Sequence, residues 1–307
     1  MRILITGASG LLGLNLALET AAKHVVYGTA KDHLLNTPAF TVLPGDLLAP
    51  GAVQQVLDQA QPDWVIHCAA LANIDACEAD PVLAQKVNTE IPAVLATDVA
   101  RGGARLVHIS TDSVFDGRRG DYSEDDAPNP LGVYARTKLD GERAVLQANP
   151  DAAVARVNLF GWSISGRRSL GEFFVRNLQA GNRVNGFTDV FFCPLLANDL
   201  AHVLVGMLQL KLNGIYHVVS PECLSKYEFG LRVASKFGLD ASLIAPTSVE
   251  RGGLLAARSP NLTLRTDKLA LALGEPIPTT SQGLERFYQQ YLDGYPERIR
   301  SMAITNE

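Results

Sequence analysis

Two side chains four residues apart could transfer a proton to a reacting carbonyl group. Tyr134 and Lys138 form a Y-x-x-x-K element within a segment of helical pattern. Residues at this spacing share one face of a helix, so we expect the phenol and the amine to lie together. An ammonium group stabilises a phenolate and lowers the tyrosine pKa. The pair is therefore suited to protonating an alkoxide during carbonyl reduction, although the spacing alone also occurs by chance in many helices.

Hydroxyl groups that could bind the carbonyl oxygen follow a predicted strand. Ser110 and Thr111 come directly after the apolar run Leu106–Ile109. Open parallel sheets bind ligands at the carboxyl ends of their strands. We expect Thr111 to donate the hydrogen bond, with Ser110 as the alternative donor and a structural cap as the simplest interpretation of both. Asn88 is a candidate for a water or backbone relay next to Lys138, or else a surface asparagine.

A glycine-rich turn near the N-terminus predicts a nucleotide site. Residues 6–13 read TGASGLLG and join an apolar run to a helical segment. Glycines permit a sharp turn, leave room for a pyrophosphate and let the helix pack closely on the strand. The N–H groups at a helix N-terminus attract phosphates. The alternative is a tight turn with a packing glycine. We expect cofactor contacts from Gly7, Ser9, Gly10, Leu11, Leu12 and Gly13.

The choice of dinucleotide depends on the end of the second predicted strand, His24–Thr29. A carboxylate there would bind a ribose 2′-hydroxyl, whereas a cation would bind a 2′-phosphate. Lys31 follows this strand, and Asp32 comes next. We expect NADP through Lys31, with NAD as the alternative and a solvated surface lysine as the simplest interpretation.

The order of these segments predicts an α/β fold with a doubly wound parallel sheet of Rossmann type. Apolar runs alternate with amphipathic stretches over residues 1–160, the predicted NAD(P)-binding domain. Residues 161–307 are expected to form a smaller substrate-binding lobe interleaved with the sheet, and part of 197–220 could return to the first domain. The tail after Gly294 shows no packing pattern, and we expect it to fray. The predicted strands are Arg2–Thr6, His24–Thr29, Phe40–Leu43, Trp64–Ala69, Arg105–Ile109, Ala153–Leu159 and Ile215–Val219. The predicted helices are Leu11–Ala22, Pro50–Gln59, Pro81–Ala100, Gly132–Gln147, Ser169–Gln179, Leu196–Gln209, Lys226–Phe237, Thr266–Leu273 and Thr280–Tyr291.

Composition narrows the class of protein. The chain has 307 residues, of which 47% are apolar, and a net charge of -5. This balance does not provide the basic face that nucleic acid or an anionic membrane requires. No stretch approaches the ~18 apolar residues of a membrane span, and the chain starts without a signal-type segment. We expect a cytoplasmic protein. Its cysteines lack metal-ligand spacing, and we expect no metal site and buried thiols at Cys68, Cys77, Cys193 and Cys223.

Longer motifs give a resemblance over residues 1–275. The blocks STDSVFDG at 110–117 and YARTKLDGE at 134–142, with HCAA at 67–70, resemble extended short-chain dehydrogenases/reductases, most closely the dTDP-4-dehydrorhamnose reductase branch. The resemblance implies reduction of a 4-keto group on a nucleotide-linked 6-deoxyhexose by NADPH or NADH. It assigns Thr111, Tyr134 and Lys138 to catalysis. Cofactor contacts beyond the glycine turn are expected from Lys31, Asp46, Leu47, Ala69, Ala70, Asn88, Tyr134 and Lys138.

The sequence departs from the branch on the sugar side. Ser113 stands where the branch usually has tyrosine, and Val190 where it has glutamine. A late R-P-x-N-S-x-L motif keeps Arg258, Asn261 and Leu264 but displaces the proline and lacks the serine. The substrate therefore need not be the usual one. We expect substrate contacts from Asp112, Ser113, Asn158 and Arg258.

Other functions stay open at this point. A sugar-nucleotide epimerase would keep its nicotinamide bound through the cycle. A non-catalytic NADP-binding regulatory subunit, like the β subunit of methionine adenosyltransferase, would fit the altered sugar-side motifs. A dehydratase is disfavoured because Ser113 replaces the glutamate it needs. Arg167 and Arg168 could contact a diphosphate, although a solvated loop pair is the simpler interpretation. A homodimer is possible.

Overall fold

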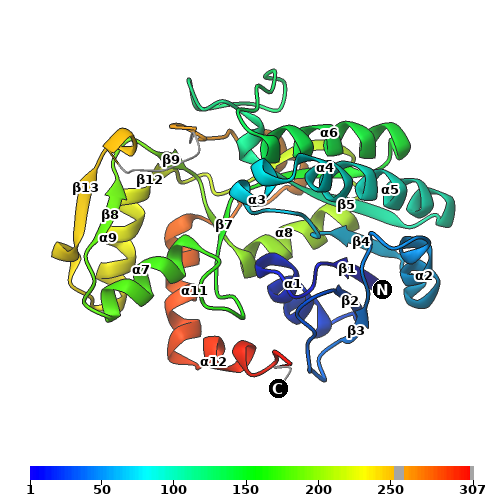
Figure 1. Cartoon of the computed structure of the whole chain (residues 1–307), viewed down its shortest axis with the longest axis horizontal. Coiled ribbons are helices and arrows are strands. Elements are labelled where there is room, and N and C mark those ends of the chain that lie inside the picture. Colours follow the sequence, from blue (N-terminus) through cyan, green and yellow to red (C-terminus); the bar gives the residue numbers. More distant parts are fainter. Residues whose placement is uncertain (252–258, 305–307) are drawn as a thin grey trace.

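The computed structural model describes residues 1–251 and 259–304 as a large α/β unit beside a smaller lobe (Figure 1). Seven strands form a central sheet in the order β11-β6-β5-β4-β1-β2-β3, with parallel neighbours throughout. The predicted doubly wound Rossmann sheet is confirmed. Its strands are β1 (Arg2–Thr6), β2 (Val25–Ala30), β3 (Thr41–Pro44), β4 (Trp64–His67), β5 (Arg105–Thr111), β6 (Ala153–Val157) and β11 (Gly214–Val218).

Helices cover both faces of this sheet. Successive side chains of a strand point to opposite faces, and in β1 Ile3 and Ile5 enter one hydrophobic core while Leu4 enters the other. The first core is closed by α1 (Leu11–Ala21) and α8 (Ala197–Gln209), which pack against each other. The second is closed by α2 (Ala52–Ala60), α5 (Ile91–Gly102) and α6 (Val133–Ala148).

The predicted helix over 81–100 is interrupted. It consists of α4 (Pro81–Gln85), a π-helical turn at Lys86–Glu90 and α5, and the short α3 (Ile74–Ala79) precedes it. The π-helical turn lies against α6, where a Cβ added at Gly141 would be 2.2 Å from the Asn88 carbonyl oxygen. The close approach of the two helices therefore requires glycine at 141. π-Helical turns often occur at functional sites.

The smaller lobe contains three amphipathic helices and short strand pairs. The two-residue strands were not predicted, because they are too short to show a periodicity. Strand β11 pairs with β6, which confirms that the 215–219 run extends the sheet, and α10 (Asp267–Leu273) packs on it. The lobe helices are α7 (Leu170–Gln179), α9 (Lys226–Phe237) and α11 (Thr280–Leu292). The strand pairs are β7 (Leu159–Phe160) with β10 (Leu195–Leu196), β8 (Val184–Phe187) with β13 (Ile244–Thr247), and β9 (Phe191–Phe192) with β12 (Leu224–Ser225).

The prediction of a frayed tail is wrong. Residues 295–300 form α12 (Tyr295–Arg300), in which Tyr295 and Ile299 are buried. The Tyr295 hydroxyl donates a 2.7 Å hydrogen bond to the Asn15 side chain on α1. Backbone bonds then join Asn36 to Met302. Contacts with residues distant in sequence hold the tail, and a local apolar pattern does not reveal such contacts.

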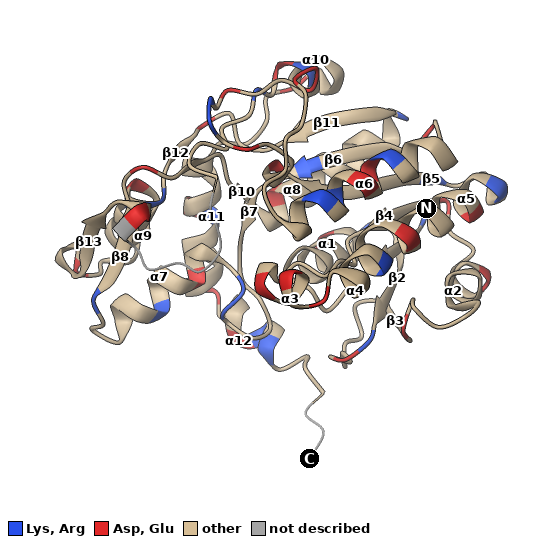
Figure 2. Ribbon diagram, turned by 45° about the horizontal axis from the view of Figure 1, so that its top comes forward, with Lys and Arg blue, Asp and Glu red and all other residues tan. Residues whose placement is uncertain are grey.

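Charged side chains of both signs are distributed over both parts of the molecule (Figure 2). In residues 1–251 and 259–304, no helix combines the length and the apolar character needed to cross a membrane. Over the same residues, no cluster of three or more His, Cys, Asp and Glu side chains is arranged to hold a metal ion.

Candidate active site

The glycine turn between β1 and α1 is shaped by its backbone. Gly7 has φ +69°, in the left-handed region that favours glycine. A Cβ on Gly13 would lie 2.2 Å from the Gly7 carbonyl oxygen, so the helix can leave the turn only with glycine there. Hydrogen bonds from Gly7 N–H and Ala8 N–H to Thr29 fix the turn to β2. The N-cap Gly10 has no side-chain cap, which suits the start of α1 to an anion.

A groove begins at this turn and has two connected parts. The part towards β2 has a volume of about 510 Å³, and we call it the adenosine half because the sequence predicts the adenosine of a dinucleotide there. The part towards β5 has a volume of about 780 Å³, and we call it the nicotinamide half because it contains the predicted catalytic residues. The predicted residues on the adenosine half are Gly7, Ser9, Gly10, Lys31, Asp46, Leu47, Ala69 and Ala70. Those on the nicotinamide half are Gly7, Gly10, Leu11, Leu12, Gly13, Ala70, Thr111, Asp112, Ser113, Tyr134, Lys138 and Asn158.

An ion pair lies at the far end of the adenosine half. Lys31 Nζ is 2.9 Å from Asp46 Oδ2, and both side chains are exposed. The hydrogen bond to Asp46 raises the pKa of Lys31. Burial acts to raise the pKa of Asp46, but hydrogen bonds from the Leu48 N–H and Lys31 leave that pKa below its usual value. A bound 2′-phosphate would therefore share Lys31 with Asp46.

The predicted catalytic side chains meet at the inner end of the nicotinamide half. Thr111 ends β5, while Tyr134 and Lys138 lie one turn apart on α6. Burial raises the pKa of Tyr134 to about 12, and a hydrogen bond between Tyr134 and Thr111 acts in the opposite direction. The phenol is thus protonated at neutral pH and lies beside a second hydroxyl.

The structure corrects the expected effect of Lys138 on the tyrosine. The Lys138 amine donates to the Ile109 carbonyl at 2.6 Å and lies 3.4 Å from His108 Nε2. Burial lowers the Lys138 pKa to about 8. Burial dominates at Tyr134 as well and raises its pKa instead of lowering it. The Ile109 carbonyl oxygen thus holds the Lys138 amine at the groove wall.

The two candidate hydroxyls after β5 have different surroundings. The Ser110 hydroxyl donates to Glu142 at 2.5 Å, and Glu142 pairs with the buried guanidinium of Arg156 at 2.8 Å. Arg156 also lies 3.4 Å from His217. Ser110 therefore belongs to a buried polar network, whereas Thr111 is next to Tyr134. The sequence analysis did not predict this network, although an arginine inside the apolar strand AVARV indicated a buried charge that needs a partner.

Asn88 lies behind the groove rather than on its surface. It is fully buried, which rules out a surface asparagine. Its side chain accepts from Leu71 N–H and donates to the Leu71 carbonyl and the Thr137 hydroxyl. These partners fix the amide at Leu71 and Thr137, and the expected relay next to Lys138 stays a prediction. Asn88 positions Leu71, which lines both halves of the groove; a direct cofactor contact from Asn88 stays a prediction.

The predicted substrate residues form a polar wall next to Thr111. Asp112 accepts from Asn158 at 2.5 Å and from Thr111 at 3.1 Å, and burial raises its pKa. The Ser113 hydroxyl also donates to Asp112. Arg258 lies outside the described residues. A smaller hollow of about 160 Å³ continues from this wall. Its lining includes residues that the sequence did not single out for this site: Phe191, Phe192, Lys226 and Leu262.

Comparisons with known proteins give the family of this chain. The profile of the family described as "RmlD substrate binding domain" matches residues 1–293. The chain belongs to this family. A dTDP-4-dehydrorhamnose reductase from Mycobacterium tuberculosis is 35% identical over 286 residues, 90% of this chain and 88% of that protein. Methionine adenosyltransferase 2 subunit beta from Danio rerio is 34% identical over 293 residues, 91% and 87% of the two chains.

A solved structure agrees in fold. The crystal structure of dTDP-4-dehydrorhamnose reductase from Bacillus anthracis in complex with NADP has a TM-score of 0.81 and 28% sequence identity. The match covers 94% of this chain and 99% of that one. The predicted resemblance to the dTDP-4-dehydrorhamnose reductase branch is therefore confirmed, and so is the predicted fold class.

This member of the RmlD family has a disulfide behind its substrate wall, contrary to the expectation of four thiols. Cys193 and Cys223 are bonded, with Cα atoms 4.1 Å apart, while Cys68 and Cys77 are free. The disulfide links the residue after β9 to the residue before β12. Sequence spacing missed it because the two cysteines are 30 residues apart and meet only through the pairing of β9 with β12.

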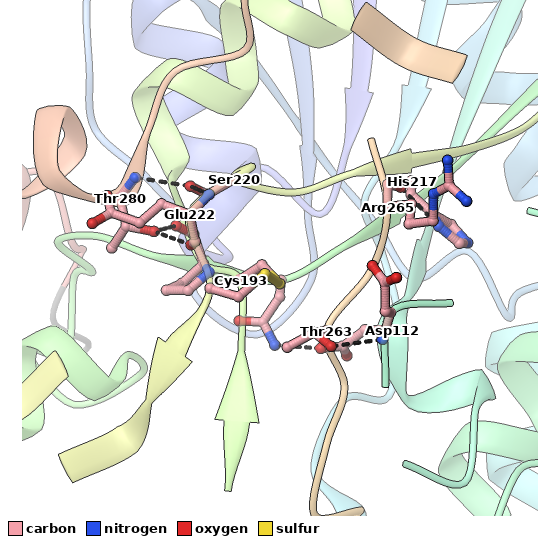
Figure 3. Close-up of a disulfide and its surroundings, with 12 residues drawn as sticks. Asp112, Cys193, His217, Ser220, Glu222, Thr263, Arg265 and Thr280 are labelled. Carbon is pink, nitrogen blue, oxygen red and sulfur yellow. Dashed lines mark hydrogen bonds between the residues drawn. A yellow bond between two sulfur atoms is a disulfide. The ribbon is translucent and has the colours of Figure 1, made fainter. Parts of the chain in front are cut away.

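The disulfide belongs to a junction of three segments (Figure 3). The Thr280 hydroxyl at the start of α11 donates to the carbonyls of Pro194 and Glu222. Its N–H donates to the Ser220 hydroxyl. The junction holds β9, β12 and α11 together, and β9 carries two aromatic residues of the substrate hollow.

Proposed function

We propose that this protein uses NAD(P)H to reduce the 4-keto group of a nucleotide-linked 6-deoxysugar. One observation carries the proposal: Thr111, Tyr134 and Lys138 line the same hollow as the glycine turn. Proton donors and a dinucleotide site thus share one cleft. The reductases among the relatives support the same activity.

The residues of the groove fit a dinucleotide. The turn that lines the groove can form only with glycine, because a Cβ would lie 2.9 Å from the Ala69 backbone at Gly7 and 2.2 Å from the Gly7 carbonyl oxygen at Gly13. The start of α1 lines the same groove. Lys31 and Asp46 would contact the adenosine ribose, and Ala69 and the neighbouring Ala70 would line the passage between the halves. Lys31 favours NADP, with NAD as the alternative. Bound NADPH or NADH supplies the hydride for the reduction.

Tyr134, Thr111 and Lys138 would carry out the proton transfer to the carbonyl oxygen. Because its pKa is about 12, the Tyr134 phenol holds its proton at neutral pH and can donate to the carbonyl oxygen. Thr111 supplies a second hydroxyl at the same place. When the oxygen becomes an alkoxide, the Tyr134 proton moves to it, since an alkoxide is far more basic than a phenolate. The Lys138 amine then stabilises the phenolate that remains.

The wall next to Thr111 would hold the sugar. Asp112, Ser113 and Asn158 present polar groups, and Phe191 and Phe192 present apolar ones. A deoxysugar has both characters, with hydroxyl groups on its ring and a methyl group. We further propose that residues 1–160 bind the dinucleotide and 161–307 mainly the substrate, with part of 197–220 in the first domain. A cytoplasmic location and a homodimer stay predictions.

The experiment is a survey of reduced-nicotinamide oxidation with a panel of nucleotide-linked 4-keto sugars. We expect NADPH to be consumed with at least one 6-deoxy member, and more slowly with NADH. An epimerase would keep its cofactor and show no net consumption. If the protein binds NADPH but consumes it with none of the panel, the reductase proposal is wrong.

A regulatory subunit is the second candidate, favoured by the 34% identity to methionine adenosyltransferase 2 subunit beta. In that case the groove would bind a dinucleotide without turnover. The regulatory function would be supported if the protein co-purified stably with a partner enzyme and showed no turnover on the panel. The meeting of Thr111 and Tyr134 in the cleft favours the enzyme.

A further inference from the structure

The two halves of the groove meet at a small set of residues. Six residues line both halves, and all but one belong to the glycine turn or to the segment that follows β4. The exception, Arg168, comes from the smaller lobe. The shared residues are Gly7, Gly10, Cys68, Ala70, Leu71 and Arg168.

The diphosphate of a bound dinucleotide would lie at this meeting point. A dinucleotide joins its adenosine and nicotinamide riboside through a diphosphate, so the anion must cross from one half to the other. Of the six shared residues, only Arg168 carries a charge. Arginine binds phosphate oxygens through two parallel N–H donors. Among the described residues, the two lysines that line the groove have partners of their own, Lys31 with Asp46 and Lys138 with the Ile109 carbonyl.

The backbone of Arg168 is held in place by a buried carboxylate. Glu172, in the first turn of α7, accepts hydrogen bonds from the N–H groups of Ser163, Arg168 and Ser169 at 2.6, 2.9 and 3.2 Å. The Ser163 hydroxyl donates to the same carboxylate. The segment from 163 to 169 thus wraps around one side chain. The Arg168 side chain is exposed and borders the groove.

We propose that Arg168 binds the diphosphate of the dinucleotide from the smaller lobe, while the start of α1 binds it from the sheet. The proposal rests on the dinucleotide site proposed above. It makes the bound cofactor a bridge between the two parts of the molecule. Arg167, the preceding residue, is exposed but does not line either half of the groove, so the two arginines form a natural pair for comparison.

The test compares Arg168→Gln with Arg167→Gln by fluorescence titration of the full-length protein. We expect Arg168→Gln to raise the Kd for NADPH about 10- to 100-fold, as for loss of a charge-assisted phosphate contact. Arg167→Gln should change it less than about 2-fold. Binding of reduced nicotinamide riboside, which carries no phosphate, should be equal in Arg168→Gln and wild type. Arg168→Lys should recover part of the affinity.

Four results would overturn the proposal. The NADPH Kd could be unchanged in Arg168→Gln, or raised equally in Arg167→Gln. The riboside could lose as much affinity as NADPH, which would indicate a structural effect. The substrate KM could rise while the NADPH Kd stays constant, which would assign Arg168 to the sugar nucleotide. If the wild-type protein binds neither NADPH nor NADH, the proposed function fails as well.

Discussion

The cofactor side and the substrate side of the cleft are built in different ways. The cofactor side is built around the glycine turn between β1 and α1, and side chains that follow β2, β3 and β4, together with Arg168, complete it. The proposed substrate side is assembled from the residues that follow β5 and from α6, β9, α9 and the 262 region. A disulfide joins the ends of β9 and β12. A turn that is fixed by backbone contacts tolerates few substitutions, whereas a wall of side chains can be substituted one residue at a time.

The difference agrees with the departures from the dTDP-4-dehydrorhamnose reductase branch that the sequence resemblance implies. Ser113 and Val190, two of the altered positions, line the substrate hollow. The glycines of the turn are fixed by contacts that a Cβ would break. We therefore expect mutations on the two sides to separate cleanly into effects on chemistry, on the substrate and on the cofactor.

The largest effect is expected from Tyr134→Phe. Loss of the proton donor should lower kcat about 1000-fold and leave the NADPH Kd within about 2-fold. Steady-state rates and fluorescence titration measure the two quantities. Tyr27→Phe, whose hydroxyl contacts the Arg2 guanidinium, is the control and should keep full activity. Unaltered turnover in Tyr134→Phe would remove the tyrosine as the proton donor.

Removal of the disulfide should weaken the substrate side. Closing a loop of 30 residues stabilises a fold by roughly 3.5 kcal/mol, and Cys223→Ser should lower the free energy of unfolding in urea by that amount. The substrate KM should rise, while the NADPH Kd should stay constant. Adding a reductant to the wild-type protein should reproduce the loss, and adding it to Cys223→Ser should change nothing. Equal stability of oxidised and reduced wild-type protein would contradict this role.

Lys138 should make stability depend on pH. Its pKa in the folded protein is about 8, below the usual 10.5, so the unfolded chain binds the proton more tightly between these values. Stability from this residue therefore rises with pH across that window, by up to roughly 3 kcal/mol. In urea unfolding, the stability of wild type minus that of Lys138→Met should increase between pH 8 and pH 10.5. A constant difference would show that Lys138 has an ordinary pKa.

The smallest effect is expected at Lys31, on the cofactor side. Lys31→Ala should weaken NADPH about 5- to 10-fold and leave NADH unchanged, because only NADPH has a 2′-phosphate. Lys23→Ala is a matched control with an exposed lysine outside the groove. If Lys31→Ala weakens both cofactors equally, the lysine does not select between them.

The two sides also differ in how far the sequence predicts them. The glycine turn and the Y-x-x-x-K element are local, so their spacing predicted each of them, and the parallel sheet brings Gly7, Gly10, Tyr134 and Lys138 to one cleft. The pairing of Cys193 with Cys223 and the burial of Asn88 depend on segments that meet only after folding. The pKa of Tyr134 depends on burial, which no motif encodes. The long helices and the sheet followed from periodicity, whereas the tail helix α12 depends on its contact with Asn15.

The most direct test of the proposed reduction follows a deuterium label from the cofactor to the sugar. NADPH carrying deuterium at the transferred position of the nicotinamide is incubated with the protein and a nucleotide-linked 4-keto-6-deoxysugar, and the sugar is analysed by mass spectrometry and NMR. The account predicts one deuterium on C4 of the reduced sugar, and almost no labelled product with Tyr134→Phe. Deuterium that stays in the cofactor, or labelled product formed equally well by Tyr134→Phe, would contradict it.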